Sequence, residues 1–236
     1  MKTALIFVGA AALVVLAYWG VRFFHFYSIS KSLVKAAVPY ENLSSDTRKT
    51  MLVLGDSTAV GVGASAPSES LPARVSRAIG ATYVENHAIS GAIVADLPSE
   101  IAKAKRSDYD FLLVQIGAND IVAFHTASST ASQLVRELSA APRASQVLII
   151  SAGDVGQATL MPEPIRPFYT RLNREYHQKF ETALSAQGYT YVDLSKAPDA
   201  ELFSSQPEIY LAADGFHPSS AGYGLWFDAI EPYLKK

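Results

Sequence analysis

The chain has 236 residues, of which 49% are hydrophobic, with a formal net charge of -2 and no cysteine. This length and apolar content suit one sizeable domain with a short appendage. The near-neutral charge gives no electrostatic basis for binding nucleic acid. The lack of cysteine excludes a disulfide framework, a thiolate metal site and a cysteine nucleophile, and nothing in the composition indicates an oligomeric state.

The N-terminal segment predicts a transmembrane helix. Residues Ala4 to Val21 carry no charge, and 18 such residues are just long enough to cross a bilayer. Aromatic residues border the run, as they do at membrane interfaces. A cleaved signal peptide is the main alternative, although the region of Tyr18 and Trp19 has no clear cleavage site, and a buried core helix is a third. We expect an anchor over residues 1–27, a serine-rich connector over 28–48 and a folded domain over 49–236.

Within that domain, short apolar runs alternate with helical patterns. This alternation predicts a three-layer α/β/α sandwich whose mostly parallel sheet has about five strands. The runs are apolar at every position, as expected for strands covered on both faces. The expected strands are 51–54, 82–84, 111–116, 147–150 and 189–192. The expected helices are 71–79, 93–104, 131–140, 167–186 and 221–234.

The first expected strand runs directly into Gly55, Asp56 and Ser57. A serine at this place is held on rigid backbone at the carboxyl end of a strand, which is the edge where open α/β sheets place their ligands. We therefore interpret its hydroxyl as a candidate nucleophile. The tripeptide alone is also compatible with an ordinary turn at the end of a strand.

Two further loops follow the second and third strands at the same edge. Gly91 lies in the first loop and can bring a backbone N–H close to a substrate, because it has no side chain. Asn119 lies in the second and can direct its amide at a developing oxyanion. The alternatives are a helix-entry turn for Gly91 and a cap or Asx-turn for Asn119.

Asp214 and His217 lie near the C-terminal end of the chain. Imidazole takes and returns a proton near neutral pH, so His217 is the best candidate for a general base. Asp214, three residues earlier, can accept a hydrogen bond from the ring and fix its tautomer. A surface turn ahead of a helix that begins at Ser219 or Ser220 is the alternative.

These four short blocks together resemble those of the SGNH hydrolases, also called GDSL-type esterases and lipases. The resemblance spans about residues 50–230, in the order and spacing of that family, and no single block is specific alone. One departure is Thr58, where the longer family signature often carries leucine. The matching positions are Gly55-Asp56-Ser57, Gly91, Gly117-Ala118-Asn119-Asp120 and Asp214 with His217 and Pro218.

The resemblance implies a flavodoxin-like fold and a serine esterase that forms an acyl-enzyme. It implies Ser57 as nucleophile, His217 as base and Asp214 as its partner. It also implies an oxyanion hole made by the backbone of Ser57 and Gly91 and the side chain of Asn119. Acyl esters, acetylated sugars and lysophospholipids all stay open as substrates, and the domain is expected outside the cytoplasm, in the periplasm or at the cell surface.

Two other functions stay open beside the esterase. One is a membrane-tethered ligand-binding module on the same fold without turnover. The other is a nucleotide-binding protein, since residues 60–63 superficially resemble a glycine loop, but the third glycine and the lysine of a phosphate site are missing. We also expect the N-terminal segment to anchor the protein without building the site, so that residues 40–236 keep their activity alone.

The remaining histidines do not indicate a metal, because no pair has ligand spacing with a third donor nearby. We expect no cofactor, a packing or surface role for His87 and His125, and no metal role for His25 in the membrane flank or His177 in a polar helix. Residues 153–167 form a long connection that suits a lid or specificity loop. Five residues are candidates for an acyl-facing rim: Phe124, Met161, Pro162, Pro164 and Phe168.

Overall fold

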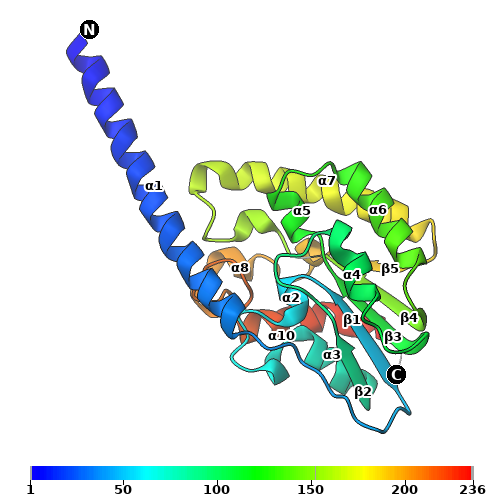
Figure 1. Ribbon diagram of the computed structural model, residues 1–236. Helices are drawn as coiled ribbons and strands as arrows, with labels where there is room; N and C mark the ends of the chain where they lie inside the picture. Colours follow the sequence, from blue (N-terminus) through cyan, green and yellow to red (C-terminus); the bar gives the residue numbers. More distant parts are fainter. Residues whose placement is uncertain (1, 152, 235–236) are drawn as a thin grey trace.

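The computed structural model describes residues 2–151 and 153–234 and confirms the predicted α/β class (Figure 1). Five parallel strands form one sheet in the order β2-β1-β3-β4-β5. Residues 235 and 236, the end of the expected domain, lie outside the described residues. The strands are β1 (Thr50–Gly55), β2 (Tyr83–Asn86), β3 (Asp108–Gln115), β4 (Arg143–Ile150) and β5 (Thr190–Val192).

Helices cover both faces of the sheet. The cluster of buried residues on one face includes side chains of α3 and α10, and the cluster on the other includes side chains of α4, α6 and α7. Figure 1 shows the same separation into layers. The helices are α1 (Lys2–Ala36), α2 (Ser57–Val60), α3 (Leu71–Ile79), α4 (Leu97–Ile101), α5 (Ala118–Val122), α6 (Ala127–Ser139), α7 (Arg166–Ser185), α8 (Leu202–Ser205), α9 (Pro207–Tyr210) and α10 (Ser220–Ile230).

Strand β1 explains why the central runs are apolar at every position. Leu52 and Leu54 pack in the cluster that contains α6 and α7, whereas Met51 and Val53 pack in the cluster that contains α3 and α10. Successive side chains of a strand point to opposite faces, so both sets are buried. The strand therefore ends on a rigid, fully covered part of the sheet.

Several element bounds differ from the sequence prediction. Strand β4 begins at Arg143 rather than at residue 147, and its first half alternates between exposed and half-buried positions, so apolar runs could not reveal it. The helix expected over 93–104 is a 3-10 turn followed by the short α4, whose Pro98 cannot continue an α-helix from the preceding turn. Helix α10 ends at Ile230, just before Pro232.

Helix α1 projects from the layered domain and is longer than expected (Figure 1). It runs without a break to Ala36, nine residues into the range 28–48 that we expected to be a connector. No glycine or proline interrupts it between residues 21 and 38, so nothing ends the helix at the membrane flank. Residues 13–36 have a mean hydropathy of 1.2, and this is the one helix in the described part of the chain that is long and apolar enough to cross a membrane.

The link between α1 and β1 is paired to the edge of the sheet. Asn42 exchanges two backbone hydrogen bonds with Val84 of β2, at 3.0 and 2.8 Å. Farther along, Lys49 accepts hydrogen bonds from the backbone N–H groups of Thr82 and Tyr83. An edge strand that is covered in this way offers fewer free backbone groups to other chains.

Candidate active site

Ser57 lies at a tight turn between β1 and α2. Gly55 has φ of 138°, and a Cβ there would lie 1.9 Å from the backbone oxygen of Gln115, so only glycine fits. Asp56 caps α2: its Oδ1 accepts hydrogen bonds from the backbone N–H of Thr58 at 2.9 Å and from the Thr58 hydroxyl at 2.7 Å. Ser57 is therefore the first residue of a helix whose start is fixed by the sheet.

Two buried carboxyl groups support this turn. One oxygen of Glu100 accepts the backbone N–H of Gly55 at 2.7 Å. Burial raises the pKa of Glu100 to about 8, with a further contribution from the charge of Asp56, so Glu100 is largely protonated near neutral pH. Burial also raises the pKa of Asp56 to about 6, against the two hydrogen bonds from Thr58.

Ser57, His217 and Asp214 form a continuous hydrogen-bonded chain. His217 Nε2 lies 2.8 Å from the Ser57 hydroxyl, and His217 Nδ1 lies 2.6 Å from Asp214 Oδ2. Burial opposes ionisation of Asp214, but the bonds and charge from His217 and two backbone N–H groups lower the pKa of its carboxyl overall. An ionised Asp214 can only accept, so Nδ1 carries the proton and Nε2 is free to accept one from Ser57.

The two other predicted residues lie beside this chain. Gly91 and Asn119 line the same cleft as Ser57 and His217. Gly91 has φ of 87°, which favours glycine, and the Asn119 amide donates to the backbone oxygen of Ala92 at 2.8 Å. That bond fixes the Asn119 side chain and uses one of its two N–H groups. The cap of α5 is Gly117, so Asn119 is not a cap residue.

The cleft in front of Ser57 has a volume of about 430 Å³. The domain contributes mainly apolar side chains beside the four predicted residues, namely Val122, Leu160, Met161 and Phe216. Of the five expected rim residues, Met161 lines the cleft. Phe124 and Phe168 instead pack against each other with ring centroids 6.0 Å apart, and both are more than half exposed.

Helix α1 forms the opposite side of the cleft, and this corrects the expectation that the N-terminal segment does not build the site. Six of its residues line the cleft at spacings of one, three or four residues, which places them on one helical face. The sequence did not reveal this face because four of the six residues lie in the range 28–48, which we expected to be a connector rather than a helix. The six residues are Phe23, Tyr27, Ser30, Lys31, Val34 and Lys35.

Arg22 joins α1 to the domain. Its guanidinium donates to the backbone oxygen of Thr159 at 3.2 Å and lies 4.8 Å from the ring centroid of Phe26. The next residue, Leu160, donates its backbone N–H to Gly215 at 3.0 Å. Gly215 lies between Asp214 and His217, so α1 is connected through two hydrogen bonds to the turn that carries both residues.

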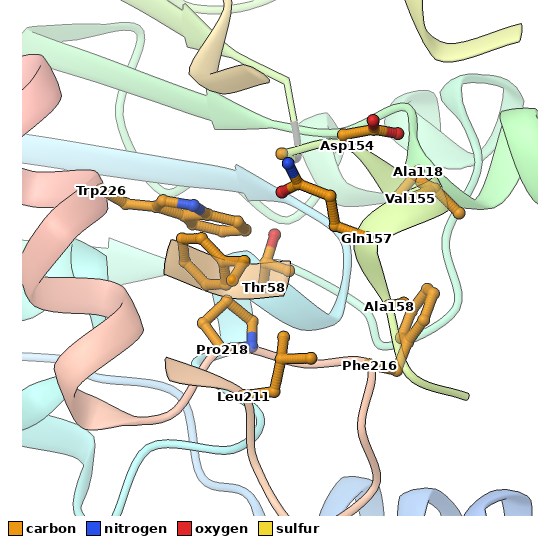
Figure 2. A pocket seen from close by; sticks show the side chains of 12 residues that line it. Thr58, Ala118, Asp154, Val155, Gln157, Ala158, Leu211, Phe216, Pro218 and Trp226 are labelled. Carbon is orange, nitrogen blue, oxygen red and sulfur yellow. The ribbon is translucent and has the colours of Figure 1, made fainter. Parts of the chain in front are cut away.

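A second, smaller cavity of about 50 Å³ lies beside Thr58. Figure 2 shows Thr58 with Trp226, Gln157 and Phe216 at this cavity. Ser57 is not among the described residues that line it. Phe216 lines both this cavity and the cleft. A side chain larger than threonine at position 58 would extend into this cavity.

Three further histidines, His87, His125 and His177, have polar partners inside the domain. His87 Nε2 lies 2.9 Å from Glu85, and His125 Nδ1 lies 3.1 Å from Asp120. His177, in the helix with a polar sequence, is only 2% exposed. Within residues 2–151 and 153–234, no group of three or more histidine, cysteine, aspartate or glutamate side chains is arranged to hold a metal ion.

Comparison with known proteins places this site in context. The profile of the GDSL-like lipase/acylhydrolase family matches residues 53–225. A GDSL-like esterase of Mycobacterium tuberculosis is 27% identical over 190 residues, which cover 76% of this chain and 60% of the relative, so the chain spans about three fifths of that protein.

Solved structures of low sequence identity share the fold. Phospholipase A1 from Streptomyces albidoflavus matches with a TM-score of 0.61 and 18% identity, over 79% of this chain and 99% of that one. The acetylxylan esterase Axe2 from Geobacillus stearothermophilus matches with a TM-score of 0.55 and 19% identity, over 80% of this chain and 96% of that one.

Proposed function

This chain belongs to the GDSL-like lipase/acylhydrolase family, and we propose that it is a serine esterase that hydrolyses carboxylic esters through an acyl-enzyme. The observation that carries the proposal is the 2.8 Å distance between the Ser57 hydroxyl and His217 Nε2, at the floor of an open cleft. A nucleophile within hydrogen-bond reach of a base that is itself oriented by a third group is the arrangement that acyl transfer needs.

In the first half of the reaction, Ser57 Oγ attacks the ester carbonyl and its proton passes to His217 Nε2. Asp214 stabilises the imidazolium that forms. The negative oxygen is held by the backbone N–H groups of Ser57 and Gly91 and by the second amide hydrogen of Asn119. The tetrahedral species then collapses, the ester C–O bond breaks, and the alcohol leaves with the proton from His217.

In the second half, water replaces the alcohol. His217 takes a proton from the water as it attacks the acyl carbonyl, and the oxyanion is held by the same donors. Collapse breaks the bond to Ser57 Oγ, which recovers the proton from His217. The products are a carboxylic acid and the free enzyme, and no cofactor takes part.

The same proposal includes a single-pass N-terminal anchor. The bilayer segment is best placed at residues 4–21, because Arg22 donates to the domain at Thr159 and the helix beyond it lies against the cleft. We place the catalytic domain outside the cytoplasm, since an esterase confined to the cytosol needs no anchor. Full-length protein is then expected to stay with membranes during carbonate extraction, and its recovery in the soluble fraction would contradict the anchor.

Labelling with a serine-directed fluorophosphonate tests the nucleophile. Full-length protein is incubated with the reagent and, separately, with a panel of chromogenic acyl esters. We expect Ser57→Ala to abolish both labelling and turnover. The matched control is Ser151→Ala, which removes another buried serine hydroxyl that lies near a histidine. Undiminished turnover by Ser57→Ala would refute the serine mechanism.

A further inference from the structure

The cleft in front of Ser57 has an apolar end and a cationic end. Phe23 and Tyr27 line it toward the N-terminal side of α1, and Lys31 and Lys35 line it toward the C-terminal side. At a rise of 1.5 Å per residue, Phe23 and Lys35 lie about 18 Å apart along the helix axis. This span is long enough to hold the two unlike ends of an amphipathic molecule.

The cationic end has no acidic counterpart in the cleft. Among the described residues that line it, none is aspartate or glutamate. The Lys31 ammonium lies 5.7 Å from the ring centroid of Tyr27, and in the described part of the chain neither Lys31 nor Lys35 forms an ion pair. Two such ammonium groups beside an apolar surface attract a negatively charged group more strongly than they would in open water.

The direction of the cleft agrees with the direction of a lipid in a bilayer. Its apolar end is nearest to residues 4–21, the segment placed in the membrane, and its cationic end is farther away. A lipid that enters along α1 would keep its acyl chain toward the membrane and its head group toward the water. The volume of about 430 Å³ lies near the lower end of the range of roughly 300 to 1,000 Å³ for ligand pockets, which favours one acyl chain.

Resting on the proposed esterase function and anchor, we propose that the substrate is a single-chain lipid ester with an anionic head group, taken from the membrane in which α1 is inserted. The acyl chain lies along Phe23 and Tyr27, the ester carbonyl lies at Ser57, and the head group lies at Lys31 and Lys35. Helix α1 thus selects the substrate as well as anchoring the enzyme.

The contact of Arg22 with Thr159 supports a fixed position for this helix. It lies only one residue before Phe23, where the apolar end of the cleft begins. At the other end of α1, Leu33 and Ala36 line a separate cavity together with Gly61 and Gly63 of the loop after α2. Helix α1 therefore meets the domain at two places, and the lysines are held above the cleft between them.

The test compares two substrates that differ only in head-group charge. Full-length protein is placed in vesicles of a dialkyl ether phosphocholine, which has no ester to cleave. The vesicles contain a small fraction of either an anionic lysophosphatidylglycerol or a zwitterionic lysophosphatidylcholine with the same acyl chain. The readout is released fatty acid, expressed as the ratio of kcat/KM for the anionic to the zwitterionic substrate.

We expect the parent to favour the anionic substrate and the double variant Lys31→Gln, Lys35→Gln to lower the ratio about tenfold, which is the effect that two partly exposed ion pairs can supply. The control is Lys103→Gln, Lys179→Gln, which removes two exposed lysines outside the cleft and should leave the ratio within about twofold. A parent ratio of one, or an equal loss on both substrates in the cleft variant, would overturn the inference.

A soluble chromogenic acetate ester separates this inference from the proposed function. If the parent cleaves that ester and Ser57→Ala does not, the esterase stands, and a head-group ratio of one refutes only the role of α1. If the parent cleaves neither the soluble ester nor the lipids, the proposed function itself has failed. Flotation of the parent with the vesicles, measured on the same sample, reports separately on the anchor.

Discussion

Two buried clusters in this domain contain a serine, a histidine and an aspartate. The first is Ser57, His217 and Asp214 at the cleft. In the second, His177 lies 3.0 Å from the Ser151 hydroxyl and 3.2 Å from Asp193. The serines are almost equally buried, with 6% and 5% of their surface exposed. Burial and residue type therefore do not distinguish the two clusters.

Backbone position and ring contacts do distinguish them. Ser57 is the first residue of α2, where the N–H groups have no acceptor within the helix. Ser151 follows β4, and its backbone N–H donates to the backbone oxygen of Val192 in β5. This N–H is therefore already engaged in pairing the two strands. The nitrogen of His177 that faces Ser151 also lies 2.6 Å from the Tyr191 hydroxyl.

The cleft supplies the remaining difference. Ser57 and His217 both line it, whereas neither Ser151 nor His177 is among its described lining residues. A carbonyl carbon can thus reach the first serine together with donors for its oxygen. The comparison teaches that the turn, the free N–H and the open space around Ser57 make its cluster the candidate for catalysis, whereas the same residue types around His177 are packed inside the domain away from the cleft.

The largest expected difference concerns the two histidines. His217→Gln removes the proposed base and should lower kcat by about 10⁴- to 10⁶-fold. Loss of the base has an effect of this size in serine hydrolases, because the catalytic residues act as a unit. His177→Gln should leave kcat within about threefold, since His177 does not reach the cleft. Steady-state turnover of a chromogenic ester measures both, and a comparable loss in the two variants would contradict the distinction between the clusters.

The second difference concerns two amides. Asn119→Ala should lower kcat by about 10² to 10³ and leave KM nearly unchanged, because the donor acts on charge that appears only in the transition state. Asn173, whose amide lies 2.6 Å from His177, is the matched control. Asn173→Ala should cost about 1 to 3 kcal/mol of unfolding free energy with near-normal kcat. A destabilised Asn119→Ala with a kcat close to the parent would refute its oxyanion role.

The third difference is seen in the pH dependence of stability. Burial lowers the pKa of His177, against the charge of Asp193. Below about pH 6.5 the unfolded chain binds a proton that the folded His177 does not, so stability falls as pH falls, by at most about 1.4 kcal/mol per pH unit. His177→Gln should show a shallower fall in its urea midpoint between pH 7 and 5. Parallel curves for parent and variant would exclude this contribution.

The smallest effect is expected at Tyr191. Tyr191→Phe removes the hydroxyl beside His177 and should cost about 1 kcal/mol of unfolding free energy, the typical value of one buried hydrogen bond. Activity should not change, because Tyr191 does not line the cleft. A measured gain of fluorophosphonate labelling at Ser151 in this variant would show that the hydroxyl suppresses a latent nucleophile.

The sequence was sufficient to predict the sheet and to predict which residues would meet at one edge of it. Ser57, Gly91 and Asn119 each follow a strand, and the carboxyl ends of parallel strands lie at one edge of the sheet. The position of each residue in the sequence therefore predicted that the three lie close together. His217, near the C-terminal end of the chain, was predicted as the proton acceptor. The structure brings these four residues into one cleft.

The sequence could not predict the second side of that cleft. Tyr27 and Met161 are far apart in the chain, and an aromatic residue beside a membrane segment has an adequate explanation without any contact to the domain. The surroundings of His177 were hidden for a similar reason, because Ser151, Tyr191 and Asp193 come from separate segments. Contacts between distant segments leave no periodic pattern.

The pairing of Asn42 with β2 has a consequence for how the proposed esterase would meet its substrate. Together with the contact of Arg22 at Thr159, it leaves little free chain between the helix and the sheet. On the proposed anchoring, the opening of the cleft then stays at one height above the bilayer instead of sweeping through the water. Encounters are confined to two dimensions, so turnover would depend on the number of ester molecules per unit of membrane area and not on their concentration in the bulk solution.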